Sequence, residues 1–320
     1  MPLTEEEVGL SEKDIWKRWL QAVKLNSWPK ILVPFFLGHA LGVYQQGTIN
    51  WGVFLFSFIA VVAGVIFIVL INDWGDQRVD KIKRNMFPES CSPKTIPDAI
   101  LPAKQVFIVG FIACIVGFLG IISASFFINH PVAALQYALL SCFTFVAYTL
   151  PPIKLNYRGG GELLEMLGVG FFLPLFMFFL QSGSHIPVGF FQIILPFATL
   201  SLSSAIASGL SDENSDREGG KRTFVTLFGN KKARIFIEIL LPVSVIFSLI
   251  ISRWGENVIP LWLMGFIQLI VVYNYLKMRK ISHLVVSNAF SQQKQYKFYL
   301  HNAIWWSATF TGVILFATTF

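Results

Sequence analysis

The chain has 320 residues, of which 54% are hydrophobic and only 13% charged, with a formal net charge of +7. This composition is far more apolar than that of an ordinary soluble domain, which excludes a water-soluble protein. We attribute the positive charge to basic loops beside anionic lipid headgroups, because no zinc knuckle or basic motif indicates nucleic-acid binding.

Long uncharged stretches predict about nine transmembrane helices, since a helix needs roughly 20 apolar residues to cross the hydrocarbon core. In chain order the expected spans are 21–44, 51–72, 104–124, 131–150, 162–181, 187–209, 234–252, 257–276 and 297–318. Turn-rich clusters such as Tyr44–Asn50 separate them. We therefore expect an all-α integral membrane protein with an amino-terminal segment, 1–20, and a transmembrane domain, 21–320. The acidic, polar start argues against a cleaved signal peptide.

The positions of the basic residues predict the orientation in the membrane. Every Lys and Arg except Arg253 lies in the first 30 residues or in, or directly beside, alternate connections between the predicted spans. Cytoplasmic loops of membrane proteins retain basic residues. We therefore predict a multi-pass protein of the cell (inner) membrane with a cytoplasmic amino terminus and, after nine spans, a carboxyl terminus on the opposite side.

Two acidic motifs follow the second and sixth predicted spans, so span parity places both on the cytoplasmic side. The first runs from Asn72 through Asp76 to Asp80, and the second contains Asp212 and Asp216. If the helices continue through them, the acidic residues of each motif share one helix face. Stacked carboxylates repel one another, and Mg²⁺ with phosphate is a natural counter-charge. The alternative is that these acidic residues are ordinary solvated helix ends. This explanation suits either motif alone better than it suits both motifs on the same side of the membrane.

A third polar segment follows the fourth span and belongs to the same side. Its Pro pair ends the helix, its Gly run permits close backbone approach, and Lys154 and Arg158 bring positive charge. Lys221 and Arg222 follow the second acidic motif. Such cations can bind diphosphate oxygens. The alternative for Arg158, Lys221 and Arg222 is that they only obey the positive-inside pattern.

At these residues the sequence resembles the UbiA superfamily of intramembrane prenyltransferases. Its members share Asn-Asp-x-x-Asp-x-x-x-Asp after helix 2 and Asp-x-x-x-Asp after helix 6, and the resemblance runs from about Lys24 to the last helix. It implies nine transmembrane helices around a central cavity, with a cytoplasmic cap and a lateral opening toward lipid. It also implies Mg²⁺-dependent transfer of a prenyl group from a polyprenyl diphosphate to a usually aromatic acceptor.

The same resemblance implies roles for individual residues. The Mg²⁺ ligands on the diphosphate would be Asn72, Asp76, Asp80, Asp212 and Asp216. Lys154 would contact the phosphates and complete a catalytic set with the four aspartates. From their charge and position, we expect Arg158, Lys221 and Arg222, together with Asn72, to contribute to diphosphate binding. Asp73 belongs to the first motif but points away from its common face.

Features of different branches are mixed in this chain. The segment from Asp212 to Thr223 looks like that of naphthoate prenyltransferases, whereas the first motif looks more like that of hydroxybenzoate prenyltransferases and chlorophyll synthases. The segment from Arg84 to Asp98 departs from the Arg-Pro-x-x-x-Gly pattern of the latter. We expect an acceptor that is an aromatic precursor in quinone biosynthesis.

Two alternatives remain open. Some relatives cyclise the prenyl diphosphate or alkylate a polyene, and a transporter would also be rich in membrane helices. A transporter is expected to carry its polar residues near mid-membrane, whereas the acidic residues here lie at helix ends. The cysteines lack metal-ligand spacing and the histidines are scattered, so neither supports a metal site or a histidine base.

Overall fold

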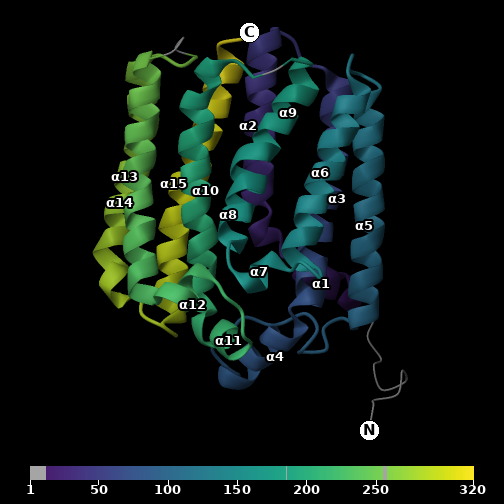
Figure 1. Cartoon of the computed structure of the whole chain (residues 1–320), viewed down its shortest axis with the longest axis vertical. Helices are drawn as coiled ribbons and strands as arrows, with labels where there is room; N and C mark the ends of the chain where they lie inside the picture. The colour runs from purple at the N-terminus through teal and green to yellow at the C-terminus, as the bar shows by residue number, and fades with distance from the viewer. Residues whose placement is uncertain (1–11, 185, 255–257) are drawn as a thin grey trace.

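The structure is a computed structural model that describes residues 12–184, 186–254 and 258–320. The regular secondary structure of these residues is entirely helical, and the long helices stand side by side in one bundle (Figure 1). Seven segments are long and apolar enough to cross a membrane: Trp51–Gly75, Ala103–Ser125, Pro131–Thr149, Gly161–Ser182, Val188–Ser211, Asn230–Ser252 and Leu261–Leu284. The helices within them are α3 (Trp51–Gly75), α5 (Ala103–Ser125), α6 (Pro131–Thr149), α8 (Gly161–Glu165) with α9 (Leu173–Ser182), α10 (Phe191–Ser208), α13 (Asn230–Trp254) and α14 (Leu261–Ile281).

Two more helices complete the bundle, α2 (Pro29–Gln46) and α15 (Phe290–Ala317). Neither is among the seven apolar segments, and both carry polar residues: α2 contains His39 and ends in two glutamines, and the first turns of α15 are rich in Gln and Lys. Both nevertheless run alongside the apolar helices in Figure 1. Among the described residues the bundle thus has nine long helical segments, which confirms the predicted number of spans.

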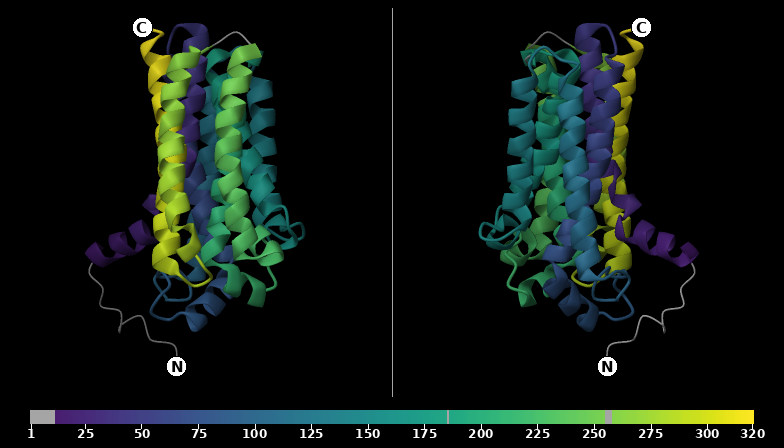
Figure 2. Two further views of the ribbon diagram at one scale, coloured as in Figure 1. Left: turned by 90° about the vertical axis from the view of Figure 1, so that its left-hand side faces the viewer. Right: turned by 90° about the vertical axis from the view of Figure 1, so that its right-hand side faces the viewer.

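The first segment begins later than the sequence pattern suggested. A separate helix, α1 (Glu12–Ala22), precedes it, and the chain turns at Lys24, whose φ of 49° is left-handed. A short 3₁₀ turn, Leu25–Ser27, follows, and the first long helix of the bundle starts at Pro29. Figure 2 shows that α1 projects sideways from one end of the bundle. Three of its apolar side chains, Ile15, Trp16 and Leu20, are exposed there.

The short helices gather at one end of the bundle, the lower end in Figure 1. They are α4 (Gln77–Met86), α7 (Leu155–Arg158), α11 (Glu213–Glu218) and α12 (Phe224–Phe228). The helices α4, α7 and α11 each follow a long helix that descends toward this end, as the parity of the spans predicted, and α12 follows α11. We call this group, with the loop 87–102, the cap. The chain leaves the bundle at the opposite end, after α15.

Small residues let the central helices approach closely. A Cβ at Gly38 of α2 would lie 2.4 Å from the carbonyl oxygen of Pro174 in α9, and one at Gly42 would lie 2.6 Å from Cβ of Gln181. Close packing through small residues is typical of membrane helices, because lipid provides no hydrophobic drive for their association. His39 lies on the same helix, and its ring nitrogens are 3.2 Å from Gln181 Oε1 and 3.0 Å from Ser57 Oγ. Its buried ring therefore has a structural role in the bundle.

Candidate active site

Both acidic motifs lie in the cap, each at a break between two helices. Asp76 separates α3 from α4, and Asp212 separates the end of α10, extended by a 3₁₀ turn, from α11. The helices therefore do not continue straight through the motifs. The backbone N–H of Asp80 still donates to Asp76 O at 2.9 Å, and that of Asp216 to Asp212 O at 2.8 Å. The helical spacing within each motif is thus kept despite the breaks.

The two motifs face each other because α4 and α11 pack closely. A Cβ at Gly219, just after α11, would lie only 2.6 Å from Cγ2 of Val79 in α4. The Lys221 ammonium then reaches across to the first motif and donates to Asp76 Oδ2 at 3.0 Å. The structure therefore brings together residues that are 145 positions apart in sequence.

A tyrosine and two lysines form the centre of this meeting point. The Tyr157 hydroxyl of α7 donates to Asp76 Oδ1 at 2.9 Å. The Lys154 ammonium lies 3.7 Å from the centroid of the Tyr157 ring, and the Lys221 ammonium lies 5.2 Å from it. Ring faces attract cations, so Tyr157 holds two positive charges beside one carboxylate. Lys154 also donates to Gly75 O at 3.4 Å.

The loop 87–102 closes over the first motif and supplies two further polar groups. Lys94 donates to Asp80 at 2.6 Å, and the Thr95 hydroxyl donates to Asp73 Oδ2 at 2.5 Å. The loop is held by Arg84, whose guanidinium forms an ion pair with Asp98, and by the Lys94 N–H, which donates to Asp98 at 2.7 Å. The Arg84–Asp98 pair therefore places Lys94 and Thr95 against the acidic residues.

Most of the aspartates are paired with a lysine from a distant part of the chain. Asp73 pairs with Lys24, and Asp212 pairs with Lys83 of α4. The latter lysine and Lys94 outweigh the effect of burial and lower the pKa of Asp212 to about 2. Burial opposes the charge of Lys94, but the neighbouring carboxylates, Asp80 first, raise its pKa. Asp212 and Lys94 are therefore charged at neutral pH.

Asp216 is the exception. Its residue is 4% exposed, and among the described residues its carboxylate has no hydrogen bond or ion pair. Burial raises its pKa to about 7, with a contribution from the negative charges of Asp212 and Asp76 against the charge of Lys221. A buried carboxylate without a bonded partner is costly unless something compensates it. Asp216 is therefore an oxygen donor that is available to a ligand.

The donor set fits Mg²⁺, although the described residues include no preformed cluster of three acidic, His or Cys side chains around one point. The available donors are carboxylate and amide oxygens, which Mg²⁺ prefers, and its shell usually includes water and substrate phosphate as well. Asp76, Asp80 and Asp212 are occupied by lysines, whereas Asp216 is not. Asp216 could therefore bind a metal ion as it stands. Any of the other three carboxylates would have to release its lysine before it could bind one.

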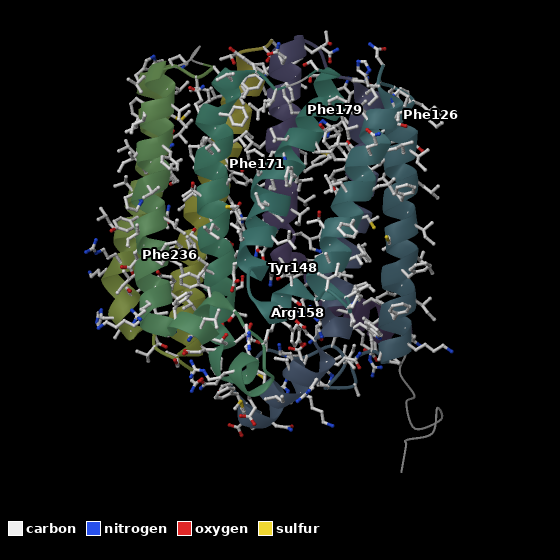
Figure 3. All side chains as sticks on the ribbon, viewed as in Figure 1. Phe126, Tyr148, Arg158, Phe171, Phe179 and Phe236 are labelled. Atoms are coloured by element: carbon white, nitrogen blue, oxygen red, sulfur yellow. The ribbon has the colours of Figure 1, made fainter. Side chains whose placement is uncertain are left out.

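The structure separates the predicted diphosphate ligands into two groups. Lys154 and Lys221 lie at the meeting point of the motifs, and Asn72 is adjacent, with its Oδ1 accepting from Thr149 at 2.6 Å. Arg158 and Arg222 are exposed. Figure 3 shows Arg158 at the lower edge of the bundle, with Tyr148 deeper inside. Only the backbone N–H of Arg222 is engaged, donating to Tyr157 O at 3.1 Å.

Several residues of the site were missed from the sequence. They are Lys24, Lys83, Lys94, Thr95 and Tyr157. The three lysines lie in basic segments that served only as evidence for orientation. Tyr157 stands between Lys154 and Arg158, and its neighbourhood in a cation-rich segment was the signal that could have identified it.

Comparisons with known proteins identify relatives of this chain. A model of the UbiA prenyltransferase family matches residues 31–303. The chain is 26% identical over 270 residues to 1,4-dihydroxy-2-naphthoate octaprenyltransferase of Escherichia coli, covering 79% of this chain and 82% of that protein. It is 24% identical over 220 residues to 2-carboxy-1,4-naphthoquinone phytyltransferase of Synechocystis sp., covering 67% of each.

Two solved structures share the fold. A UbiA homolog from Archaeoglobus fulgidus, bound to DMAPP and Mg²⁺, superposes with a TM-score of 0.63 at 14% identity, covering 90% of this chain and 99% of that one. A digeranylgeranylglyceryl phosphate synthase gives a TM-score of 0.57 at 17% identity, with 94% and 99% covered.

Proposed function

Because the chain belongs to the UbiA prenyltransferase family, we propose that its cap is the site where a prenyl group passes from a polyprenyl diphosphate to an aromatic quinone precursor. The observation that carries this proposal is the meeting of the two acidic motifs around the unpaired Asp216, with Lys154 and Lys221 beside them. A site that binds a diphosphate together with a metal ion needs both carboxylates, which bind the metal, and cations, which bind the phosphates.

We assign the Mg²⁺ ligands to the two motifs, namely Asn72, Asp76, Asp80, Asp212 and Asp216. When bound, the metal neutralises the negative charge that develops on the diphosphate as the allylic C–O bond breaks. Asp216 needs no rearrangement to take part, because its carboxylate has no competing partner among the described residues. Asp76 must first release Lys221 and Tyr157.

Two lysines at the meeting point of the motifs, Lys221 and Lys154, are the groups that hold the diphosphate. Lys221 moves from Asp76 to a phosphate oxygen, and Lys154, already stacked on the same tyrosine ring, binds alongside it. Ammonium groups form charge-assisted hydrogen bonds with phosphate oxygens. The resting ion pairs thus keep the lysines in place until substrate arrives.

The apolar bundle above the cap protects the reacting carbon from water. The Tyr148 ring contacts the start of α8, since a Cβ at Gly161 would lie 3.4 Å from Cε2 of Tyr148. Figure 3 shows this tyrosine inside the bundle, on the side of the cap that faces the membrane span. An aromatic wall of this kind excludes water and attracts the cationic prenyl fragment.

The names of the two curated relatives favour a bicyclic aromatic acceptor over a polyene or an intramolecular cyclisation. Both are named for the transfer of a prenyl or phytyl group to a naphthalene-derived ring. We also propose that the cap faces the cytoplasm, because every Lys and Arg except Arg253 lies in segments on its side of the bundle.

The proposal is tested with purified protein, Mg²⁺ and labelled geranylgeranyl or farnesyl diphosphate, first alone and then with a panel of quinone precursors. We expect a prenylated aromatic product that requires both Mg²⁺ and acceptor, and that is lost in Asp216→Asn. Labelled hydrocarbon formed without an acceptor would instead show a cyclase. Full turnover by Asp216→Asn would reject the assigned metal site.

A further inference from the structure

The connection between α14 and α15 lies at the same end of the bundle as the cap (Figure 1). After α14 the chain makes a 3₁₀ turn, Ser282–Leu284, and α15 begins at Phe290. This connection carries none of the residues assigned above to the metal or the diphosphate. It nevertheless contacts the second acidic motif on both sides of Asp212.

Two side chains of α15 hold the chain directly before Asp212. The Gln293 amide donates to Leu210 O at 3.0 Å, and the Lys297 ammonium donates to Ser211 Oγ at 2.5 Å. Gln293 is fully buried, and a buried polar group that loses its partner pays the full cost of desolvation. The approach to the second motif is therefore fixed from α15.

Two side chains of α11 bond to the same connection directly after the first aspartate of the motif. Glu213 is buried, and its Oε2 accepts a hydrogen bond from the Ser287 hydroxyl. The Asn214 amide donates to Asn288 Oδ1 at 3.0 Å. Asn288 has a left-handed φ of 67°, which asparagine adopts more readily than most residues. The connection thus bonds to the motif on both sides of its helix break.

The first turn of α15 also contacts α4, the helix of the first motif. The Phe290 ring lies 5.1 Å from the Phe87 ring, centroid to centroid, and its centroid lies 5.6 Å from the Lys83 ammonium. Lys83 is the lysine that pairs with Asp212. Because a ring face attracts a cation, Phe290 favours the position in which Lys83 joins the two motifs.

A comparable bond at the start of the connection leads to a different helix. Ser282 Oγ accepts from the Arg234 guanidinium of α13 at 2.9 Å. Ser282 and Ser287 thus each bond to a charged side chain. The partner of Ser282 lies in α13, whereas the partner of Ser287 lies directly beside Asp212. The two serines therefore form a matched pair for a test.

The helix that joins Asp212 to Asp216 needs support from its surroundings. It is α11, which has only six residues, and isolated helices shorter than about 12 residues are marginal in water. A metal held between the two motifs makes the demand stricter, because Mg²⁺ requires near-ideal octahedral geometry. Carboxylates on separate short helices satisfy that geometry only if something fixes their separation.

We propose that residues 287–297, which we call the α15 bracket, position the second acidic motif against the first, and that Ser287 is a positioning residue of the reaction. The inference rests on the proposed function, since the separation of the motifs matters when they share a metal. The Ser287 hydroxyl holds Glu213, and Glu213 holds the neighbouring Asp212 in place.

The first part of the test is hydrogen exchange of residues 209–218 in the metal-free, full-length protein. The Asp216 N–H donates to Asp212 O, so its exchange reports on opening of this segment. Ser287→Ala should speed that exchange about tenfold, because it removes a hydrogen bond to a charged group. Ser287→Thr keeps the hydroxyl and should restore the wild-type rate. Ser282→Ala, the matched control, should leave it unchanged.

The second part measures how much Mg²⁺ the site requires. Mg²⁺ with geranylgeranyl diphosphate should protect residues 209–218 from exchange, and Ser287→Ala should need several-fold more Mg²⁺ for half-maximal protection. Ser287→Thr and Ser282→Ala should need the wild-type amount. A contact that only stabilised the fold would lower the fraction of active protein without changing this requirement. Unchanged exchange in Ser287→Ala, equal effects of Ser287→Ala and Ser282→Ala, or an unchanged Mg²⁺ requirement would overturn the inference.

The outcomes also separate this inference from the proposed function. If the Mg²⁺ requirement follows Ser287 but no aromatic acceptor is prenylated, the α15 bracket stands and the proposed function falls. If aromatic acceptors are prenylated and Ser287→Ala needs no more Mg²⁺ than the wild type, the proposed function stands and the role of the α15 bracket falls.

Discussion

The Lys221 ammonium lies 3.0 Å from Oδ2 of Asp76, although 145 residues separate the two in sequence. This ion pair spans the gap between the two acidic motifs. The Tyr157 hydroxyl binds the other oxygen of the same carboxylate at 2.9 Å. One carboxylate therefore links α3, α7 and the segment after α11, and each of these contacts can be altered separately.

The first prediction concerns Lys221 and its exposed neighbour. Lys221→Met should lower kcat/KM for the prenyl diphosphate by roughly 10²-fold to 10³-fold, the usual loss when a group that stabilises developing charge is removed. Arg222→Met should change it by less than about threefold, because an exposed charge contributes little. Steady-state kinetics at saturating acceptor measure both. Equal losses in the two variants would contradict the placement of Lys221 in the site.

The second prediction concerns the packing of α4 on α11. Gly219→Ala places a methyl group against Cγ2 of Val79 and should cost about 1–3 kcal/mol of local packing, with loss of activity as the motifs separate. The double variant Gly219→Ala with Val79→Ala should recover most of the activity, because the second change makes room. Gly64→Ala, where a Cβ meets nothing within 4 Å, is the control. Failure of the double variant to recover would show that contact with Val79 is not the cause.

The third prediction concerns the loop 87–102. The hydrogen bond from Arg84 lowers the pKa of Asp98 below its ordinary value of 3.8. Because the folded-state pKa is depressed, this contact stabilises the loop at neutral pH and is lost as the pH falls through the folded-state value. Hydrogen exchange of the loop, corrected for its intrinsic rate, should therefore be constant from neutral pH to about pH 5 and increase below about pH 4.

The same contact can be tested at neutral pH through a buried thiol. Cys91 lies in this loop and is 8% exposed. Asp98→Asn should speed its reaction with a thiol reagent in a background in which Cys114 and Cys142 are replaced by alanine. Glu89→Gln, an exposed acidic residue of the same loop, should leave the rate unchanged. A slow reaction in Asp98→Asn would show that the loop is closed by other contacts.

The fourth prediction concerns orientation. In a background without native cysteines, Gln46→Cys lies at the last residue of α2, at the end opposite the cap, and Ser92→Cys lies in the cap loop. A membrane-impermeant thiol reagent should label Gln46→Cys in intact cells, and Ser92→Cys only after permeabilisation. The reverse pattern would place the cap outside the cytoplasm.

The helices and the two motifs were predictable from the sequence because each depends on local pattern. Apolar stretches of sufficient length define the spans, and span parity is enough to bring Asp76 and Asp212 to one end. The break at Lys24 was not predictable, because a left-handed φ of 49° at a lysine has no signature in composition. The predicted first span, 21–44, therefore begins before the first long helix, which starts at Pro29.

The partners of the aspartates could not be predicted, because they depend on how loops fold in three dimensions. Lys83 and Lys94 belong to a basic segment, and basic segments at this end are expected for reasons of orientation alone. Their pairing with Asp212 and Asp80 follows from the turn of α4 and from the Arg84–Asp98 contact. Ser287 was overlooked for a different reason: it lies outside the three polar segments that follow the predicted spans, and its partner Glu213 comes from another helix.

The pairing of lysines with aspartates also determines how the site responds to its surroundings. Asp73, Asp76, Asp80 and Asp212 each have their own ammonium counter-ion, supplied by the protein and not by the solution. On the proposed function, binding of a metal diphosphate would exchange one set of ion pairs for another: the metal would go to carboxylate and the ammonium to phosphate, with little change in total charge. Since few ions are taken from or released to the solvent, substrate affinity should depend only weakly on ionic strength, unlike that of an open basic surface.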